Sequence, residues 1–367
     1  MKIGILTFHR ADNYGAVLQC YALFKTIKSL GFQDVKVIDY CPSYFTDEYS
    51  LFSLKRFIKS SVRGKMGMLK EFILFFIPKL LRRRYFSSFV SRLSLTDKMD
   101  QSNISFADFD IVFVGSDQVW NRKLTCGEDK ALSGQIRHDN MVLASYAAST
   151  EYHKNIIEEN EYYLSLIKRF DFISLRENVL VEYFNSLSSK KAQWVLDPTL
   201  LFNKEQWSVV CKQPKEDNYL LVYTVPVDTA VMKLAKMIAD ERGLKIIELV
   251  SRVRYVYKKS CRQLVSPNEF LGYFQKASYV VTTSFHGTAF SLVMKKQFCT
   301  LMLGRAVDVR AKDLLSNLGL NSRCVSSSQL VVPCQDIDYS IVEDKLNLQR
   351  NNSLQYIKSV IGNFSER

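Results

Sequence analysis

Glycine and proline are scarce in this sequence, and its cysteines are widely spaced. The 367 residues include only 14 Gly and 7 Pro, so the chain has no low-complexity linker and does not resemble a fibrous or disordered protein. Its eight Cys are never closer than ten residues to one another, which excludes the CxxC pairs of zinc and redox motifs. No repeat of solenoid period is visible, and no apolar run approaches the roughly 20 residues that a membrane-spanning helix needs.

An export signal is also lacking at the start of the chain. Ile3 to Phe8 is apolar, but it is too short for the apolar part of a signal peptide and runs directly into His9 and Arg10. We therefore expect a cytoplasmic protein with reduced thiols.

Positive charge is abundant, and it is concentrated in two windows. The formal net charge is +13, while residues 51–100 carry +9 and residues 251–300 carry +7, so the remainder of the chain is slightly acidic. Charge gathered in this way indicates two contacts with anionic groups. We do not expect a nucleic-acid partner, because the basic windows lack the residue patterns of known nucleic-acid binding motifs.

The first window contains a basic segment, residues 55–86, in which ten Lys and Arg stand against Glu71 alone. Its apolar part, 72–77, is too short to span a bilayer. One interpretation is a basic amphipathic element that makes a peripheral contact with anionic lipid headgroups. The other is a helical hairpin that packs on the protein with a solvated basic face.

Strand-like and helix-like patterns alternate along the chain in two successive series. This predicts the α/β class, with two doubly wound, Rossmann-like domains facing a cleft. We place an N-terminal domain at 1–205 with a basic insertion at 50–95, a C-terminal domain at 206–340 and a C-terminal helix at 341–367. Ligands of such folds bind where strands lead into helices, so we expect the chemistry in those loops.

Four motifs lie at predicted strand exits. They are Asp12-Asn13-Tyr14-Gly15, Gly115-Ser116-Asp117-Gln118-Val119-Trp120-Asn121, Ser174-Leu175-Arg176-Glu177 and Ser284-Phe285-His286-Gly287-Thr288. Each has a structural alternative. Asp117 could cap the next helix, and Arg176 with Glu177 could be a surface ion pair. The last motif carries most weight, because we expect 284–287 to form a loop in which the amides of Gly287 and Thr288 bind an anion beside His286.

Taken in this order, together with Tyr146-Ala147-Ala148-Ser149 and Asp197-Pro198-Thr199, these motifs resemble the polysaccharide pyruvyl transferase family between about residues 13 and 303. The resemblance implies a fold similar to the two-domain GT-B glycosyltransferases. It also implies a transferase that moves pyruvate from phosphoenolpyruvate to two hydroxyls of a sugar in a cell-surface polysaccharide, forming a cyclic ketal. Phosphoenolpyruvate would be a co-substrate, and neither cofactor nor metal is implied.

The resemblance also assigns roles to residues. It implies Arg176, His286 and Asp117 as catalytic residues. The expected donor-binding residues are Arg176, Ser284, His286, Gly287, Thr288 and Arg305. The expected acceptor-binding residues are Asn13, Tyr14, Gly15, Gln19, Ser116, Gln118 and Trp120. One departure from the family stands out: many members have Arg where this chain has Ser284, so we expect Arg305 or Arg310 to supply the missing positive charge.

Two other functions stay open at this point. A GT-B nucleotide-sugar glycosyltransferase would share the architecture, but residues 270–307 contain no Asp or Glu to hold ribose hydroxyls. A non-catalytic member of a polysaccharide assembly complex is the second alternative. For the transferase we expect a sugar acceptor carried on a lipid, and hence a peripheral location on the inner face of the cytoplasmic membrane.

Overall fold

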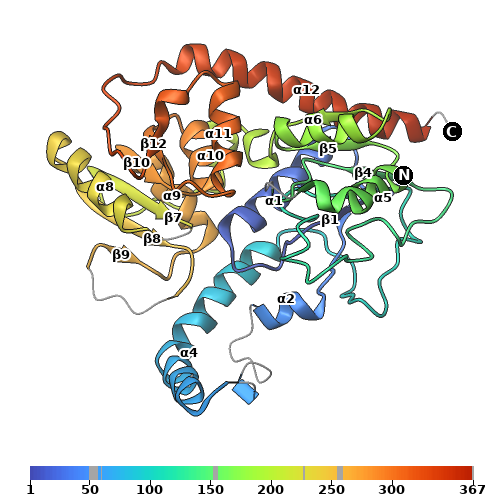
Figure 1. The fold of residues 1–367 in the computed structure, drawn as a ribbon, viewed down its shortest axis with the longest axis horizontal. Coiled ribbons are helices and arrows are strands. Elements are labelled where there is room, and N and C mark those ends of the chain that lie inside the picture. The colour runs from blue at the N-terminus through green and yellow to red at the C-terminus, as the bar shows by residue number, and fades with distance from the viewer. Residues whose placement is uncertain (49–56, 59, 152–155, 226–227, 254–258, 366–367) are drawn as a thin grey trace.

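Strands and helices alternate to build two parallel sheets, one in each half of the chain (Figure 1). The computed structural model describes residues 1–48, 57–58, 60–151, 156–225, 228–253 and 259–365. Residues 49–56 and 59, which include three cations of the basic segment, lie outside the described residues. The predicted class, α/β with two Rossmann-like halves, is confirmed.

The first sheet has the strand order β2-β1-β3-β4 and is parallel throughout. Its strands are β1 (Ile3–Leu6), β2 (Val35–Val37), β3 (Ile111–Val114) and β4 (Val142–Ser145). Backbone bridges from Ala144 to Phe172 and from Ala148 to Leu175 attach a further parallel pair to β4. That pair consists of β5 (Ile173–Leu175) and β6 (Ala192–Trp194).

The second sheet has the order β12-β11-β10-β7-β8-β9, again all parallel. Its strands are β7 (Tyr219–Thr224), β8 (Lys245–Val250), β9 (Cys261–Arg262), β10 (Tyr279–Thr282), β11 (Gln297–Met302) and β12 (Cys324–Ser326). The central strands β7 and β10 are buried along their whole length, as expected for a sheet covered on both faces by helices.

Helices connect the strands in both halves. The α-helices are α1 (Tyr14–Ser29), α2 (Ser43–Glu48), α4 (Val62–Val90), α5 (Asn160–Arg169), α6 (Asn178–Leu187), α7 (Lys204–Ser208), α8 (Thr229–Arg242), α9 (Pro267–Lys276), α10 (Phe285–Val293), α11 (Asp308–Asn317) and α12 (Tyr339–Ser365). Short 3₁₀ turns are η1 (Ile156–Glu159), η2 (Pro198–Leu200) and η3 (Asn321–Arg323). Local signals set many of these ends: Ser266 and Glu269 form a capping box on α9, and Gly243 ends α8 at φ 63°.

From Val62 onward the described part of the basic segment forms one long helix, α4, and not two helices of a hairpin. Helix α4 runs through Pro78 without ending and projects from the body of the protein (Figure 1). Its C-terminal turns are anchored, because Phe86, Phe89 and Val90 belong to the main hydrophobic core. Its N-terminal turns lie farther out and are largely exposed.

Helix α10 begins earlier than the sequence suggests, and this corrects the predicted anion-binding loop. The helix starts at Phe285, so His286 lies in its first turn. Ser284 caps it: the Ser284 hydroxyl accepts from the amide of Gly287, and the Ser284 carbonyl accepts from the amide of Thr288. These two amides are therefore occupied within the helix.

The two halves share one hydrophobic core. Tyr14, at the start of α1, stacks on Phe270 of α9 with 4.2 Å between ring centroids. The long helix α12 follows the second sheet, yet Tyr356 on it donates to the carbonyl of Ser145 at the end of β4, 2.7 Å away. Figure 1 shows α12 extending along both halves. Strand exits from the two sheets are thereby held close together.

Candidate active site

Four strand exits from the two halves converge on one buried group of charged side chains. Asp117 follows β3, Arg176 and Glu177 follow β5, and Asp197 follows β6. His286 comes from the second half, where it follows β10. Because the carboxyl ends of parallel strands face the same edge of a sheet, residues that are distant in sequence meet here.

Arg176 lies at the centre of this group. Its Nη1 donates to Asp197 at 2.8 Å, its Nε donates to Glu177 at 3.2 Å, and its Nη2 is 3.8 Å from Asp117. The guanidinium lies over the ring of Phe285, 4.5 Å from its centroid. The side chain is buried, so the alternative of a surface pair between Arg176 and Glu177 is wrong. The Nη2 atom, although buried, makes no hydrogen bond to any described residue.

Asp197 connects Arg176 to His286. It also accepts from the hydroxyls of Ser116 at 3.1 Å and Thr199 at 2.7 Å. Burial alone would raise the pKa of this carboxyl, but the neighbouring His286 and Arg176 outweigh it and hold the pKa well below its ordinary value. Asp197 is therefore a buried carboxylate that stays charged. In the sequence Asp197 is visible only as part of the motif Asp197-Pro198-Thr199, which by itself assigns it no role.

His286 is held between the two halves of the protein. Its Nε2 is 3.7 Å from Asp197 and makes no hydrogen bond with the described residues. On its other side the ring abuts Gly15, where an added Cβ would lie only 2.1 Å from Nδ1. Gly15 is therefore required for close approach of α1 to the imidazole, which gives it a positioning role in place of the expected contact with the acceptor.

Glu177 is the member of the group that reaches the adjacent pocket. One carboxylate oxygen accepts from Ser149 at 2.8 Å and from Arg176, while the other is buried and unpartnered among the described residues. Burial raises the pKa of Glu177 despite the nearby Arg176 and Arg310. A carboxyl with a raised pKa and a free oxygen is suited to hold and donate a proton.

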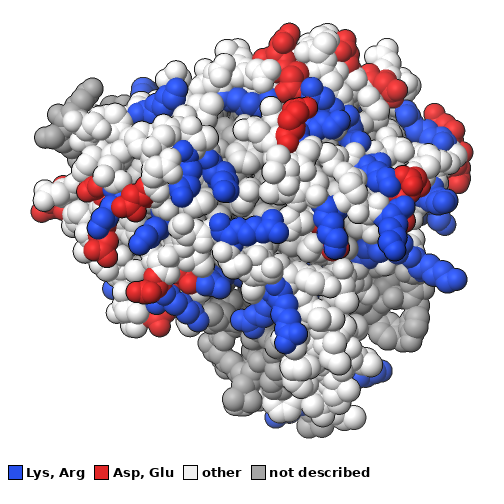
Figure 2. Space-filling model, turned by 180° about the vertical axis from the view of Figure 1, so that it is seen from behind, with Lys and Arg blue, Asp and Glu red and all other residues white. Residues whose placement is uncertain are grey.

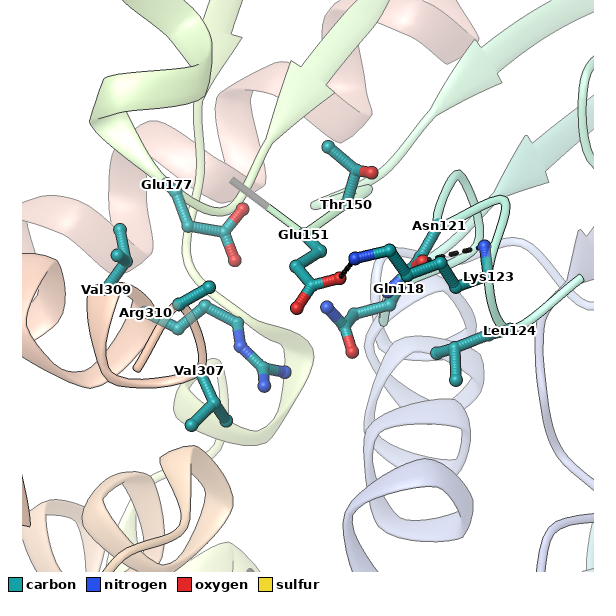
Figure 3. A pocket seen from close by; sticks show the side chains of 11 residues that line it. Gln118, Asn121, Lys123, Leu124, Thr150, Glu151, Glu177, Val307, Val309 and Arg310 are labelled. Atoms are coloured by element: carbon teal, nitrogen blue, oxygen red, sulfur yellow. Dashed lines mark hydrogen bonds and ion pairs between the residues drawn. The ribbon is translucent and has the colours of Figure 1, made fainter. Parts of the chain in front are cut away.

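The pocket lies between the two halves and encloses about 250 Å³ (Figure 3). Gln118, Thr150 and Glu177 line it from the first half, and Val307 and Arg310 line it from the second. Figure 3 shows the Arg310 guanidinium and the Glu177 carboxylate both directed into this space. Arg310 therefore supplies a cation to the pocket, whereas Arg305 is exposed and does not line it.

Other predicted contact residues lie inside the protein. Trp120 is fully buried, stacks on Phe184 and donates to the carbonyl of Leu132. Tyr14 is buried in the seam between the halves and donates to the carbonyl of Val265. These two side chains pack the interior and do not line the pocket, so their expected contact with an acceptor has no support from this geometry.

Gln19, Ser116, Asn13 and Thr288 likewise serve the local structure. Gln19 is buried and accepts from the amide of Ser116, which holds the loop after β3. Asn13 caps α1 through the amide of Ala16. The Thr288 hydroxyl pairs with that of Thr300, 2.8 Å away in the core. Of the seven expected acceptor residues, only Gln118 lines the pocket.

The alternative interpretation of Asp117, that it caps the next helix, is wrong because no regular helix directly follows it in the structure. Its carboxylate accepts from the amide of Gln118, and it adopts φ 77°, a conformation uncommon for residues other than glycine. A positive φ at a residue other than glycine costs about 1–3 kcal/mol of free energy, so the surrounding structure must hold Asp117 in this conformation. This conformation directs Asp117 toward Arg176.

Carboxylates outnumber guanidinium groups in and beside the buried group. Asp117, Glu177 and Asp197 contribute three carboxylates, against the guanidinium groups of Arg176 and Arg310. The pocket is also lined by Lys123 and Glu151, which pair at 2.8 Å, so its charged lining residues are Arg310, Lys123, Glu151 and Glu177. Within the described ranges, no three His, Cys, Asp or Glu side chains gather as ligands for a metal ion.

Comparison with known proteins agrees with this geometry. A structure assigned as a UDP-N-acetylglucosamine 2-epimerase from Listeria monocytogenes is 10% identical, with a TM-score of 0.51 over 97% of this chain and 90% of that one. The UDP-GlcNAc 2-epimerase of Methanocaldococcus jannaschii, solved with UDP-GlcNAc and UDP, is 13% identical with a TM-score of 0.48 and covers 99% of each chain. At this identity the likeness concerns the fold alone, which is GT-B-like. A search of curated proteins found no match.

Sequence comparison is more specific than the structural likeness. The family model for polysaccharide pyruvyl transferase matches residues 13–303, which contain all four of the strand exits that meet at the buried group. This chain is therefore a member of the polysaccharide pyruvyl transferase family.

Proposed function

We propose that the protein transfers the pyruvyl group of phosphoenolpyruvate to two hydroxyls of one sugar, forming a cyclic ketal and releasing inorganic phosphate. The observation that carries the proposal is the buried Arg176–Asp197–His286 network beside a pocket that contains Arg310. Membership of a pyruvyl transferase family supports the reaction type.

The reaction places definite demands on the site. A proton adds to the methylene carbon of the donor, and C2 becomes electrophilic. One sugar hydroxyl then attacks C2 and loses its proton, after which a second hydroxyl displaces phosphate from the same carbon. The site must therefore donate one proton, accept protons from two hydroxyls and stabilise the charge on the leaving phosphate.

Arg310 is the residue that we assign to the anionic donor. It is the arginine that lines the pocket, whereas Arg176 is engaged by three carboxylates. Arg176 instead acts as a positioning residue that holds Asp197 and Glu177 in place. Its unpartnered Nη2 leaves one donor for the phosphate or carboxylate of phosphoenolpyruvate.

We assign the proton transfers of this reaction to three side chains. Glu177, with its raised pKa and free oxygen at the pocket, is suited to protonate the methylene carbon. Asp117 acts as the base for an acceptor hydroxyl. His286 lies near Asp197 with a free Nε2 but outside the pocket lining, as does Asp117, so we propose that the donor reaches from Arg310 into the buried group, where His286 protonates the leaving phosphate.

Donor binding is the first test. Titration calorimetry with phosphoenolpyruvate should show affinity about tenfold to a hundredfold weaker for Arg310→Ala, because a charged hydrogen bond to the donor is lost. Arg305→Ala is the matched control, since this exposed arginine lies in the connection that precedes α11 and does not line the pocket. Equal affinity of the Arg310→Ala variant and the wild type would remove Arg310 from the donor site.

Turnover is the second test. Phosphate release from phosphoenolpyruvate, measured over a panel of methyl pyranosides with two free hydroxyls, should fall by about 10²–10⁴-fold in His286→Ala. Near-wild-type turnover would remove His286 from the mechanism. Stabilisation by a uridine or guanosine diphosphate, and none by phosphoenolpyruvate, would instead indicate a glycosyltransferase. Donor binding without turnover on any acceptor would indicate a non-catalytic member of an assembly complex.

The acceptor that we propose is a sugar of a cell-surface polysaccharide repeat unit carried on a lipid. Such an acceptor would place the protein at the inner face of the cytoplasmic membrane. The search for membrane-spanning segments found none among the helices of the described residues.

A further inference from the structure

Helix α4 carries an apolar stripe that no part of the described structure covers. Met66, Leu69, Ile73 and Ile77 are exposed to 70%, 50%, 70% and 66%. Their spacing of three, four and four residues places them on one side of the helix. Leu74 and Phe76 widen the stripe. Large apolar side chains that gather on one exposed surface mark a site of interaction.

Positive charge flanks this stripe. Arg63, Lys70, Arg83 and Arg84 are all exposed on the same helix. The acidic residue of α4, Glu71, is paired with Lys79 at 2.8 Å. In the lower part of Figure 2, where α4 lies, the visible surface is white and blue without red. The partner of this surface must therefore be apolar and negatively charged.

Arg82 differs from its two neighbours because it is buried. It donates to the hydroxyl of Tyr14 at 2.9 Å and to the carbonyls of Ser251 at 2.8 Å and Gln263 at 3.1 Å. One arginine of the triplet therefore fixes the base of α4 to both halves of the protein. Arg83 and Arg84 remain exposed.

We propose that α4 docks on an anionic lipid bilayer, with the stripe in the headgroup region and its cations on lipid phosphates. Lipid fits both the apolar and the charged part of the surface. A second copy of the chain fits less well, because two α4 helices would bring like charges together. The proposal goes beyond the reaction and does not depend on it.

Vesicle sedimentation tests the proposal with the full chain. We expect binding to vesicles of phosphatidylglycerol and phosphatidylcholine that weakens between about 0.05 and 0.5 M salt, and little binding to phosphatidylcholine alone. Arg83→Glu combined with Arg84→Glu should reduce partitioning by about tenfold or more. Ile73→Asp combined with Ile77→Asp should reduce it by a similar factor, because apolar insertion is lost.

The matched control is Ile341→Asp, which changes an apolar residue of α12 that is 58% exposed and distant in sequence from α4. It should bind vesicles as the wild type does. Thermal melts of all variants should be alike, since the altered side chains are exposed. Equal binding to neutral vesicles, insensitivity to salt, or no effect of the α4 substitutions would overturn the proposal. So would a stable dimer in sedimentation velocity that the Ile73→Asp, Ile77→Asp variant abolishes.

Discussion

A single buried carboxylate organises the candidate site at the scale of the residue. Asp197 accepts from Arg176, Ser116 and Thr199, and it lies 3.7 Å from His286. Without it, Arg176 would keep a buried positive charge with one fewer counter-ion. Removing one partner of a buried ion pair is costly because the other is left uncompensated.

We predict that Asp197→Asn lowers the free energy of unfolding by about 3–5 kcal/mol at neutral pH. The pKa of Asp197 is lowered in the folded state, so its stabilisation is present above its unfolded pKa, near 4, and is lost as pH falls below that value. Denaturant titrations from pH 7 to pH 3 should therefore show the difference between variant and wild type shrink. Asp338→Asn, at an exposed aspartate, should have a much smaller effect. A constant difference over this range would contradict the ion-pair explanation.

A second prediction at this scale concerns Gly15. In Gly15→Ala the new methyl group would lie 2.1 Å from Nδ1 of His286, so the ring or α1 must shift. We expect a loss of about 1–3 kcal/mol of stability from overpacking and about tenfold or more of phosphate release. Gly362→Ala in α12, where a Cβ meets nothing within 4 Å, is the control and should be neutral or stabilising. Wild-type turnover in Gly15→Ala would show that the imidazole position is not critical.

At the scale of the element, one residue decides where α10 begins. Ser284 caps the helix, at the position where the resemblance to the family implied an arginine. The cap draws Phe285 and His286 into the first helical turn, and that turn directs the imidazole toward the first half. The missing arginine is therefore not simply a lost anion contact, because the serine has a structural task of its own.

We predict that Ser284→Ala destabilises the protein by about 0.5–2 kcal/mol, whereas Ser284→Asn, which keeps a capping oxygen, restores most of that loss. Thermal melting with and without phosphoenolpyruvate would test this. If the asparagine variant were as unstable as the alanine variant, the cap would not account for the role of Ser284.

At the scale of the whole molecule, the halves are joined by buried contacts and not by a linker alone. Tyr14 packs on Phe270, accepts from Arg82 and donates to Val265, so it bonds to two separate segments of chain. We therefore expect the halves to unfold together in one cooperative transition.

Tyr14→Ala should lower the free energy of unfolding by about 3–5 kcal/mol, because it leaves a large cavity between the two halves. Tyr14→Phe keeps the ring contact and loses the hydroxyl, so its cost should be about 1 kcal/mol. For both variants, circular dichroism and tryptophan fluorescence should be followed through the same denaturant titration. If a substitution shifted the unfolding midpoint seen by one probe and not that seen by the other, the halves would unfold independently.

Periodic patterns and local signals predicted much of the fold. The alternation of strands and helices indicated the two Rossmann-like halves, and local capping residues such as Ser266 and Gly243 lie at helix ends in the structure. The motif order indicated the family, and four of its motifs contain residues of the buried group. These features depend on neighbours within a few residues, which the sequence displays directly.

The tertiary structure decided which of these residues meet. Asp197 and Arg310 gained their roles because the packing of the two halves brings the loop after β6 and the start of α11 close together. Trp120 and Tyr14 lost their expected contacts because neighbouring elements bury them. The sequence feature that could have identified Asp197 as a site residue is its place in the motif Asp197-Pro198-Thr199. Burial and distance between segments arise from the packing of whole elements, so no local pattern could reveal them.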